Sequence, residues 1–461
     1  ALDNHKYGDF TPYLLESTNR GATWTSMRGD LPDRTLVWRI VQDHVKPELF
    51  FAATESGLYF SASAGGAWVK LAGGVPTISF RDLAIQEREN DLVGASFGRG
   101  FFVLDDYSSL RSVSEEQLAE EAALFPIRKA WWYHPRFLLG EQENGYIGAN
   151  HYVAPNPDFG AVFTYHLRDG LKTKEEIRQA GERAKLEADE DIPFPGWDAV
   201  ADEMAESDPR IWIIVKDSDG NTVRRVSGPI QQGMNRVAWD LRHPAPEALR
   251  LGSSSGSESS GLLAAPGTYS ATLAKELDGE ITTLSPPVQF EVVPLRDGAL
   301  RGSSYVEAAA FWRSYENSVR TASAVNQTLG MEVNRIEAMK TALSRAPAAP
   351  GDLDERLNRL RTNLQDIENR LYGNRAKRQV GERVSPTVES RLSAVDLGVY
   401  HSTYGPTATL RTTLEIADAQ LEQIKADLEE AQSEAAALGV DLVRAGAPWV
   451  GGNPLPRGPG G

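Results

Sequence analysis

The chain has 461 residues, a net charge of −16 and a pI near 5.1, and about 150 residues per domain predicts about three domains. Hydrophobic residues make up 41% and charged residues 24%, which is typical of a folded protein and excludes wholesale disorder. Cysteine is absent, which excludes disulfides and thiolate sites, and no apolar run is long enough to cross a membrane. The acidic balance also argues against a large nucleic-acid interface, which needs clustered Lys and Arg.

The first 110 residues contain an internal repeat. Residues 17–24 read S-T-N-R-G-A-T-W and residues 61–68 read S-A-S-A-G-G-A-W, with Trp24 and Trp68 lying 44 residues apart. Short runs rich in Val, Ile, Phe and Trp, separated by Gly or Pro, predict strands at 37–42, 49–54, 57–61 and 67–71. A period of about 40–50 residues with several short strands is typical of propeller blades.

Both copies resemble the Asp-box of bacterial-neuraminidase repeats, Ser-x-Asp-x-Gly-x-Thr-Trp. Asn19 stands in place of the Asp in the first copy, and Ser63 and Ala67 depart from the pattern in the second. The physical role of such a box is a hairpin turn, in which a short polar side chain caps backbone amides, Gly takes a positive φ and Trp packs between sheets. We therefore expect a structural role for Ser17, Asn19, Gly21, Thr23, Trp24, Ser61, Gly65 and Trp68.

Residues 82–107 resemble the last blade of a family of large, exported bacterial proteins with sortilin-like (BNR) repeats, commonly labelled glycosyl-hydrolase-like. The resemblance covers most of the chain and corresponds to the C-terminal half of such proteins. It implies a bacterial protein exported to the periplasm or the cell exterior. The repeats amount to about two and a half blades, whereas a propeller closes with about four or more. We therefore expect a further polypeptide, either a preceding segment or a second chain, to supply the missing blades.

Residues 111–296 are expected to form an immunoglobulin-like β-sandwich. The motifs G-x-N-x-V-x-W-D and A-P-G-x-Y are similar to bacterial immunoglobulin-like modules of the flagellar-hook-capping type, and they place Trp239 and Tyr269 in the core. Residues 169–209 form an acidic insertion with 13 acidic and 5 basic residues. We expect a helix over 172–186 and otherwise a solvated loop; a cation site near Glu187 is the alternative, although the spacing does not fit a Ca²⁺ loop. The Ser/Gly run 252–260 contains G-x-S-x-G but reads as a flexible loop, because no strand precedes it and no helix follows.

Apolar residues at alternating spacings of three and four predict an antiparallel three-helix bundle over 297–440, followed by a Pro/Gly-rich tail over 441–461. Asn326 falls on the seam of the first helix, where it could fix the register. The basic stretch 369–378 reads as a solvated helix end, with a small anion site as the alternative. The fold expected is therefore multidomain β plus α: partial propeller blades over 1–110, an immunoglobulin-like sandwich and a heptad helical bundle.

Catalytic candidates are few. A glycoside hydrolase needs two carboxylates about 5–9.5 Å apart; Asp43, Asp82 and Asp105 are the candidates, and sequence spacing cannot pair them. The seven histidines form no metal-binding spacing, and we expect no cofactor and no metal. We predict a non-catalytic binding or scaffolding protein that recognises a protein or glycan, binds no nucleic acid and is part of a larger protein or complex. The alternative is a fragment or subunit of a propeller-type glycoside hydrolase.

Overall fold

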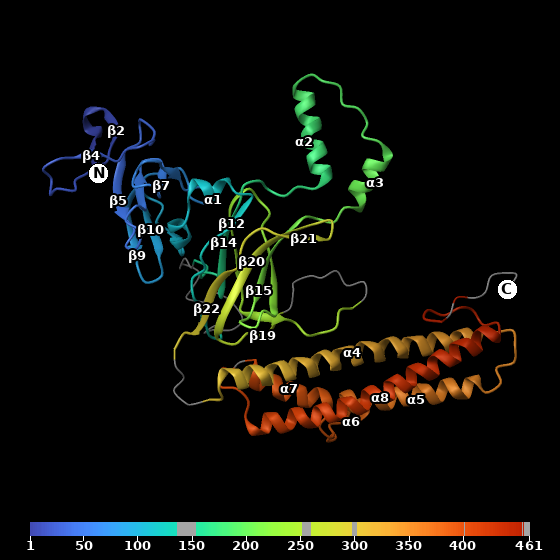
Figure 1. Cartoon of the computed structure of the whole chain (residues 1–461). Coiled ribbons are helices and arrows are strands. Elements are labelled where there is room, and N and C mark those ends of the chain that lie inside the picture. Colours follow the sequence, from blue (N-terminus) through green and yellow to red (C-terminus); the bar gives the residue numbers. More distant parts are fainter. Residues whose placement is uncertain (136–153, 251–259, 297–301, 401, 454, 456–461) are drawn as a thin grey trace. The chain divides into compact units, whose positions relative to one another are not determined.

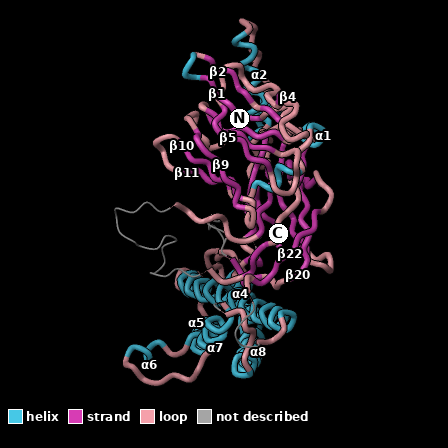
Figure 2. Tube along the Cα trace, turned by 90° about the vertical axis from the view of Figure 1, so that its left-hand side faces the viewer, coloured by secondary structure: helices cyan, strands magenta, loops and turns pink. Residues whose placement is uncertain are grey.

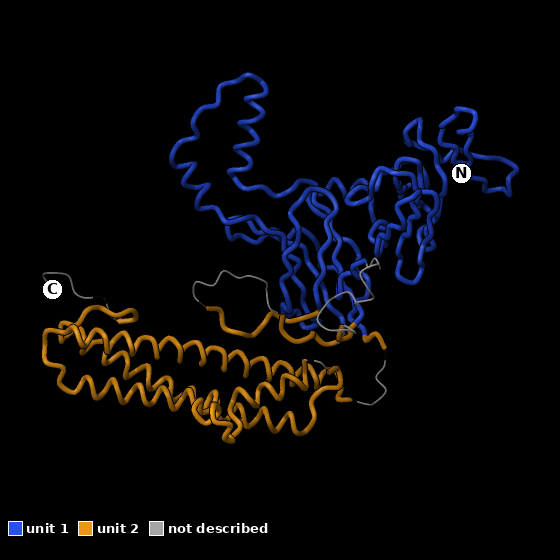
Figure 3. Tube along the Cα trace, turned by 180° about the vertical axis from the view of Figure 1, so that it is seen from behind, with its two compact units in different colours: residues 1–131, 137–240, 267–293 blue, residues 132–136, 241–266, 294–461 orange. Residues whose placement is uncertain are grey.

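The computed structural model describes residues 1–135, 154–250, 260–296, 302–400, 402–453 and 455, and Figure 1 shows its elements. The chain is mixed β plus α, as expected, with strands up to residue 294 and long helices from residue 305 onward. It divides into two compact units, coloured in Figure 3: unit 1 comprises residues 1–131, 137–240 and 267–293, and unit 2 comprises 132–136, 241–266 and 294–461. Most of the Ser/Gly run, residues 252–259, lies outside the described residues.

Unit 1 begins with antiparallel strands joined by short turns. β1 (Leu2–Asn4) pairs with β2 (Asp9–Tyr13), and β3 (Leu15–Glu16) pairs with β4 (Thr25–Ser26). A four-stranded meander follows, made of β5 (Val37–Gln42), β6 (Phe50–Thr54), β7 (Gly57–Ser61) and β8 (Val69–Lys70). A three-stranded meander comes next, made of β9 (Phe80–Gln86), β10 (Asp91–Ser96) and β11 (Phe101–Leu104).

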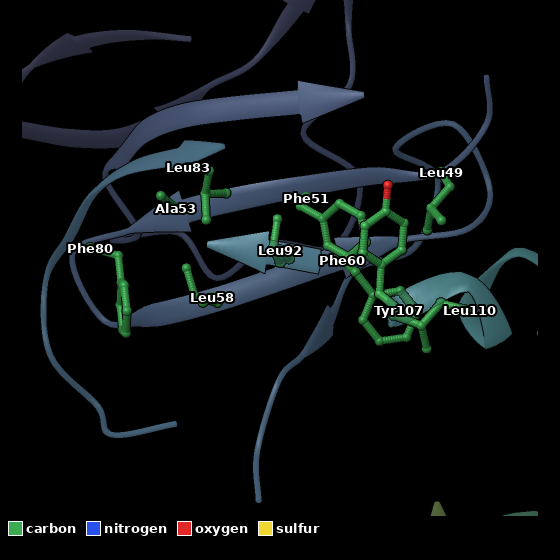
Figure 4. Close-up of a cluster of buried hydrophobic side chains, with 10 residues drawn as sticks. All are labelled: Leu49, Phe51, Ala53, Leu58, Phe60, Phe80, Leu83, Leu92, Tyr107 and Leu110. Atoms are coloured by element: carbon green, nitrogen blue, oxygen red, sulfur yellow. The ribbon is translucent and has the colours of Figure 1, made fainter. Parts of the chain in front are cut away.

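The two meanders share one hydrophobic core, shown in Figure 4, which is closed by the short helix η2 (Tyr107–Arg111). The Tyr107 ring lies edge-on to Phe51, with ring centroids 4.8 Å apart. Both β6 and β7 are buried along nearly their whole length, as expected of central strands that are covered on both faces. The buried members of this core are Leu49, Phe51, Ala53, Leu58, Phe60, Phe80, Leu83, Leu92, Tyr107 and Leu110.

The first repeat turn connects β3 to β4. The Ser17 hydroxyl accepts a hydrogen bond from the Gly21 N–H at 2.7 Å, and Asn19 Oδ1 accepts one from the Thr23 N–H at 2.8 Å. Asn19 Nδ2 in turn donates to Thr23 Oγ1 at 2.8 Å. A short polar side chain thus satisfies the turn's backbone amides, and Gly21 has a φ of +88°.

The second turn connects β7 to β8 and repeats this pattern with a different residue. The Ser61 hydroxyl accepts from the Gly65 N–H at 2.9 Å, and Ser63 Oγ, in place of Asn19, accepts from the Ala67 N–H at 3.0 Å. Gly65 has a φ of +85°. A hydroxyl at this position can therefore replace the amide oxygen as the acceptor.

The two tryptophans of the repeat have different surroundings. Trp68 is buried: Asp30 Oδ1 accepts its backbone N–H at 2.7 Å and the Met27 carbonyl accepts its indole N–H at 3.1 Å. Trp24, the equivalent residue, is 61% exposed, so the expectation that it packs between sheets is wrong. The physical reason is that residues 27–30, which follow the first repeat turn, cover Trp68 of the second turn. No described segment covers Trp24 in the same way.

Two further antiparallel sheets complete the β-structure. The first sheet has the strand order β12 (Ala122–Leu124), β14 (Ala161–Leu167) and β17 (Gly233–Trp239). The second sheet has the strand order β13 (Ala130–Trp132), β22 (Val288–Pro294), β20 (Gly267–Leu277), β15 (Arg210–Lys216) and β16 (Thr222–Gly228). The short strand β21 (Glu280–Thr283) pairs with β20. Alternate residues of β14 and β15 are buried, as the period of two requires. Trp239 and Phe163 from the first sheet meet Tyr269 and Phe290 from the second, so the predicted core positions of Trp239 and Tyr269 are confirmed.

The acidic insertion contains two helices, α2 (Lys174–Glu187) and α3 (Trp197–Ala205), of which only the first was expected. Neither helix buries a residue. Arg178 joins them through Nε and Nη2, which donate to the two carboxylate oxygens of Glu203 at 2.7 and 2.9 Å. This pair of ionic hydrogen bonds, rather than an apolar core, holds the two helices together. A short helix, α1 (Glu115–Ala119), precedes β12.

Unit 2 is dominated by helices, shown in Figure 2. They are α4 (Tyr305–Leu343), α5 (Leu353–Tyr372), α6 (Arg375–Gln379), α7 (Val388–Val399) and α8 (Ala408–Arg444). Both α5 and α7 pack against α4 and α8, so these two shorter helices together occupy the place of a third long one. The small sheet of β18 (Arg242–Pro244) and β19 (Ser260–Leu263) lies against α4, where Glu316 Oε1 accepts the Leu262 N–H at 2.9 Å.

The apolar residues of α5 that are spaced four and three positions apart are all buried: Leu353, Leu357, Leu360, Leu364, Ile367 and Leu371. Asn326, predicted on the seam of α4, is instead exposed, and that prediction is wrong. The buried polar groups of α4 include Ser318, whose hydroxyl donates to Asp418 Oδ1 of α8 at 2.5 Å, and Glu332. Helix α8 extends to Arg444, and beyond it Asn453 Oδ1 accepts from Arg335 at 3.1 Å. The tail therefore contacts the bundle up to Asn453.

The two repeat turns generate a stability prediction. A Cβ on Gly65 would lie 2.8 Å from the Met27 carbonyl oxygen, whereas a Cβ on Gly21 would meet only Trp24, at 3.6 Å. We expect Gly21→Ala to cost about 1–2 kcal/mol, the strain of a left-handed backbone. Gly65→Ala should cost clearly more, because it adds a clash with the backbone. Urea unfolding of the full chain measures both; equal losses would contradict the tight packing of the second turn.

Candidate functional site

The first candidate carboxylate, Asp43, follows β5 and is fully buried. Its Oδ1 accepts hydrogen bonds from the Tyr107 hydroxyl at 2.6 Å and from Arg111 Nη2 at 2.8 Å. Its Oδ2 accepts from Arg111 Nε at 2.9 Å and from the backbone N–H groups of Val45 and Lys46 at 3.1 and 2.6 Å. Five donors therefore converge on one carboxylate, and Arg111 binds it through two parallel hydrogen bonds.

The electrostatics of this cluster favour a permanently ionised Asp43. Burial alone would raise its pKa, but the hydrogen bonds from Arg111, Tyr107 and the two backbone N–H groups outweigh it and hold the pKa well below the usual range. Burial and the hydrogen bond to Asp43 raise the pKa of Tyr107 above its usual value. A carboxylate that stays charged and has its oxygens occupied suits a structural role and neither donates nor accepts protons near neutral pH.

Asp82 is a different kind of carboxylate. It lies on β9 with a side chain that is 67% exposed, and its Oδ1 is 3.4 Å from Arg39 Nε on β5. The same Oδ1 accepts a hydrogen bond from the N–H of the next residue, Leu83, at 2.9 Å. An exposed ion pair of this type contributes little to stability and leaves the carboxylate solvated.

Asp105 follows β11, and burial, together with the negative charge of Asp91, raises its pKa. Arg236 on β17 opposes this shift, and the same guanidinium donates to the backbone carbonyls of Asp105 and Asp106 at 2.7 and 2.8 Å. No hydrogen bond or ion pair joins Asp43, Asp82 and Asp105 to one another in the described part of the chain. The charged groups that act on the Asp105 pKa are Asp91, Asp158, Arg236 and Arg128.

A cluster of aromatic and charged side chains lies on the surface of the two meanders. We call it the Trp38–Arg81 platform and define it as Trp38, Glu55, Ser79, Arg81 and Phe97. It was not predicted from the sequence. The Arg81 guanidinium lies 3.8 Å from the centroid of the Trp38 ring and 5.2 Å from that of Phe97. Glu55 Oε2 accepts the Trp38 indole N–H and the Ser79 hydroxyl, each at 2.8 Å, and lies 3.7 Å from Arg81 Nη2. Glu55 Oε2 therefore holds Trp38 in place and keeps the Arg81 guanidinium over the Trp38 ring.

The platform is partly open to solvent: Arg81 and Phe97 are exposed, whereas Trp38 is half-buried, with the His5 ring edge-on to it at 5.4 Å between centroids. Phe97 is 71% exposed, and Phe101 and Val103 on the edge strand β11 are 76% and 54% exposed. Trp38 and Arg81 hold the second position of β5 and β9, so the repeat itself places them side by side on adjacent meanders. The equivalent positions of Trp38 and Arg81 in the two repeats were the signal in the sequence that could have predicted this pair. A partly exposed cation–π pair with an exposed aromatic ring beside it is typical of a ligand-binding surface.

No metal or membrane site is apparent in the described regions. Within them, no group of three or more His, Asp or Glu side chains could hold a metal ion. Of the helices in those same residues, none combines the length and apolarity needed to cross a bilayer.

Comparisons with known proteins returned little. No protein-family model matches the chain, and neither does any curated protein. Among solved structures, two crystal structures from B. thetaiotaomicron are similar at 10% identity with a TM-score of 0.17. They are described as the extracellular domain of a candidate one-component system and of a candidate hybrid two-component system. The chain is covered to 61% and 60%, and it spans 28% of each of those proteins. A TM-score of 0.17 does not define a shared fold, so these descriptions apply to those proteins alone.

The Asp43 cluster generates a pH-dependent prediction. Because the pKa of Asp43 is lower in the folded state than its ordinary value of 3.8, its stabilisation is fully present above about pH 4 and is lost as the pH falls further. Asp43→Asn should cost about 3–5 kcal/mol at pH 7, since it leaves Arg111 buried without its counter-ion. It should also flatten the fall in stability below pH 4.

The matched control is Asp82→Asn, which removes an exposed carboxylate on the neighbouring strand. Its free energy of unfolding should stay within about 0.5 kcal/mol of the wild type. Denaturant unfolding at pH 3 to 7 measures both variants. A loss at Asp43 no greater than that at Asp82 would contradict the structural role.

Proposed function

We propose that this chain is a non-catalytic binding and scaffolding protein that recognises a protein or glycan ligand. The observation that carries the proposal is the Trp38–Arg81 platform, in which Glu55 holds the half-buried Trp38 ring and the exposed Arg81 guanidinium beside the exposed ring of Phe97. Preorganised aromatic and arginine side chains are the groups that contribute most to binding at protein interfaces. Asp43, the most deeply buried candidate acid, is occupied by internal hydrogen bonds instead.

We further propose that residues 1–110 are propeller-type repeats and that another polypeptide, or another segment of the same one, adds further repeats. Two features support this. Trp24 is exposed where its repeat equivalent Trp68 is covered by residues 27–30. The second meander has three strands where the first has four, and its edge strand β11 presents Phe101 and Val103. The Ser17 and Ser61 turns keep their assigned role as Asp-box hairpins in this proposal.

The proposal includes an immunoglobulin-like role for the sandwich, as a spacer or docking surface, and export from a bacterial cell. The export part rests on the resemblance of residues 82–107 to exported bacterial proteins with sortilin-like repeats. The acidic insertion supports a basic protein partner, because its net charge of −8 (13 acidic and 5 basic residues) would attract one over long distance.

A propeller-type glycoside hydrolase is the second candidate, and one observation favours it. Asp105 has a raised pKa and lies near the charge of Asp91, as the general acid of a carboxylate pair would. The assay that separates the two candidates is turnover of chromogenic glycosides and polysaccharides by the purified full chain. We expect no turnover. Activity that persists through purification and disappears in Asp105→Asn would establish the hydrolase.

The platform itself is tested by binding of the full chain to glycan and peptide arrays. Trp38→Ala should weaken binding to the recognised probes about tenfold or more, because it removes the ring under Arg81. Trp197→Ala is the matched control, since Trp197 is a 79% exposed tryptophan on α3. Equal binding by the wild type and Trp38→Ala would show that the platform is not the recognition surface.

A further inference from the structure

A cavity of about 870 Å³ lies in unit 2 beside the loop that joins α5 to α7. Its walls come from the end of α5, the loop 374–387 and the first half of α8. The volume falls in the range of about 300–1,000 Å³ that is typical of small-molecule sites. All of its lining residues belong to the helical unit, so the site is independent of the platform in unit 1.

The cavity lies in the most basic stretch of an acidic chain. Residues 369–383 contain five basic residues and one acidic residue, although the whole chain has a net charge of −16. Three of these cations, Arg370, Lys377 and Arg383, line the cavity, together with a single carboxylate, Glu415. The local charge therefore favours an anion.

Two of the three cations are available to a ligand. Arg370 is held by ion pairs with Asp427 at 2.6 Å and Asp366 at 3.1 Å. By contrast, neither Lys377 nor Arg383 has an acidic side chain within ion-pairing distance in the described structure, and both are exposed. Two cations that line one cavity and lack acidic partners can both form charge-assisted hydrogen bonds with a bound anion.

The loop that carries these cations is closed at its base. A Cβ on Gly373, just after α5, would lie 3.1 Å from Val384 Cγ1 and 3.4 Å from Thr387 Cγ2, so the two ends of the loop touch. Asn374 Oδ1 accepts the Lys377 N–H at 3.1 Å and thereby caps α6. Thr387 and Ser390 form a reciprocal capping box at the start of α7. Compact loops with touching ends are frequently functional, because their closed base holds the exposed side chains in place.

We propose that this cavity binds a sugar-sized molecule that carries a phosphate or sulfate group. Lys377 and Arg383 bind the oxyanion, for which charge-assisted hydrogen bonds are the strongest available contacts. The remainder of the cavity is too large for a bare ion and is lined by the amides of Asn369 and Gln423 and the apolar side chain of Ile416. Amides suit hydroxyl groups, and the apolar floor suits a sugar ring face.

The test is isothermal titration of the full chain with glucose 6-phosphate and with galactose 6-sulfate. Inorganic phosphate and sulfate form the comparison arms. We expect at least one ester to bind at least tenfold more tightly than its inorganic anion, with an affinity that falls as salt is added. The result also tells which of the two esters the cavity prefers.

The variant Lys377→Gln/Arg383→Gln should weaken binding of that ester at least tenfold, since it removes both available charges. Both side chains are exposed, so the thermal unfolding midpoint should not change. The control is Arg359→Gln, an arginine on α5 whose side chain is 65% exposed and which does not line the cavity. Equal binding by the variant and the control, inorganic anions binding as tightly as the esters, or no binding of either ester at roughly 10 mM would each overturn the proposal.

Discussion

The buried ion pair between Asp43 and Arg111 is the constraint on which the arrangement of the N-terminal sheets depends. Asp43 directly follows the first strand of one meander, and Arg111 lies on η2, 68 positions along the chain and beyond the second meander. Pairing them draws η2 back against both sheets, where Tyr107 and Leu110 close the shared core. A charge this deeply buried is tolerated only when it is fully paired, so the contact fixes one geometry rather than many.

The same region connects the N-terminal meanders to the sheet that contains β17. Arg111 also donates to Asn90 Oδ1 at 2.7 Å in the β9–β10 turn, and Lys46 Nζ donates to the Arg111 carbonyl at 2.7 Å. Just before η2, the carbonyls of Asp105 and Asp106 accept the guanidinium of Arg236 from β17. Polar contacts between distant parts of the chain, together with the shared hydrophobic core, therefore determine the arrangement of unit 1.

The features that could be predicted were those with a short period. The heptads of α5 and the alternation around Trp239 and Tyr269 identify buried faces, because each residue's burial follows from its neighbours three, four or two positions away. Trp24, Asn326 and α3 were mispredicted because their environment depends on which distant segment packs there. The Arg111 partner of Asp43 and the Trp38–Arg81 platform were missed for the same reason: each joins residues about 40 or more positions apart.

Buried and exposed side chains have different roles in this chain. Asp43 stabilises the fold through its buried hydrogen bonds. The Trp38–Arg81 platform, the exposed Trp24 and the basic cavity beside α6 are instead accessible to other molecules. The helices of the acidic insertion bury nothing and so add little to the core. This division supports the binding role that we propose for the chain.

The most direct test of this account is the titration of the Asp43 side-chain carboxyl by carbon-13 NMR in the intact chain, assigned with Asp43→Asn. The account predicts a midpoint well below the ordinary aspartate pKa of 3.8, with no change of charge between pH 4 and pH 8, because Arg111 and Tyr107 hold the ionised form. A midpoint at or above the ordinary value would contradict the structural role of Asp43 and return it to the candidates for acid catalysis.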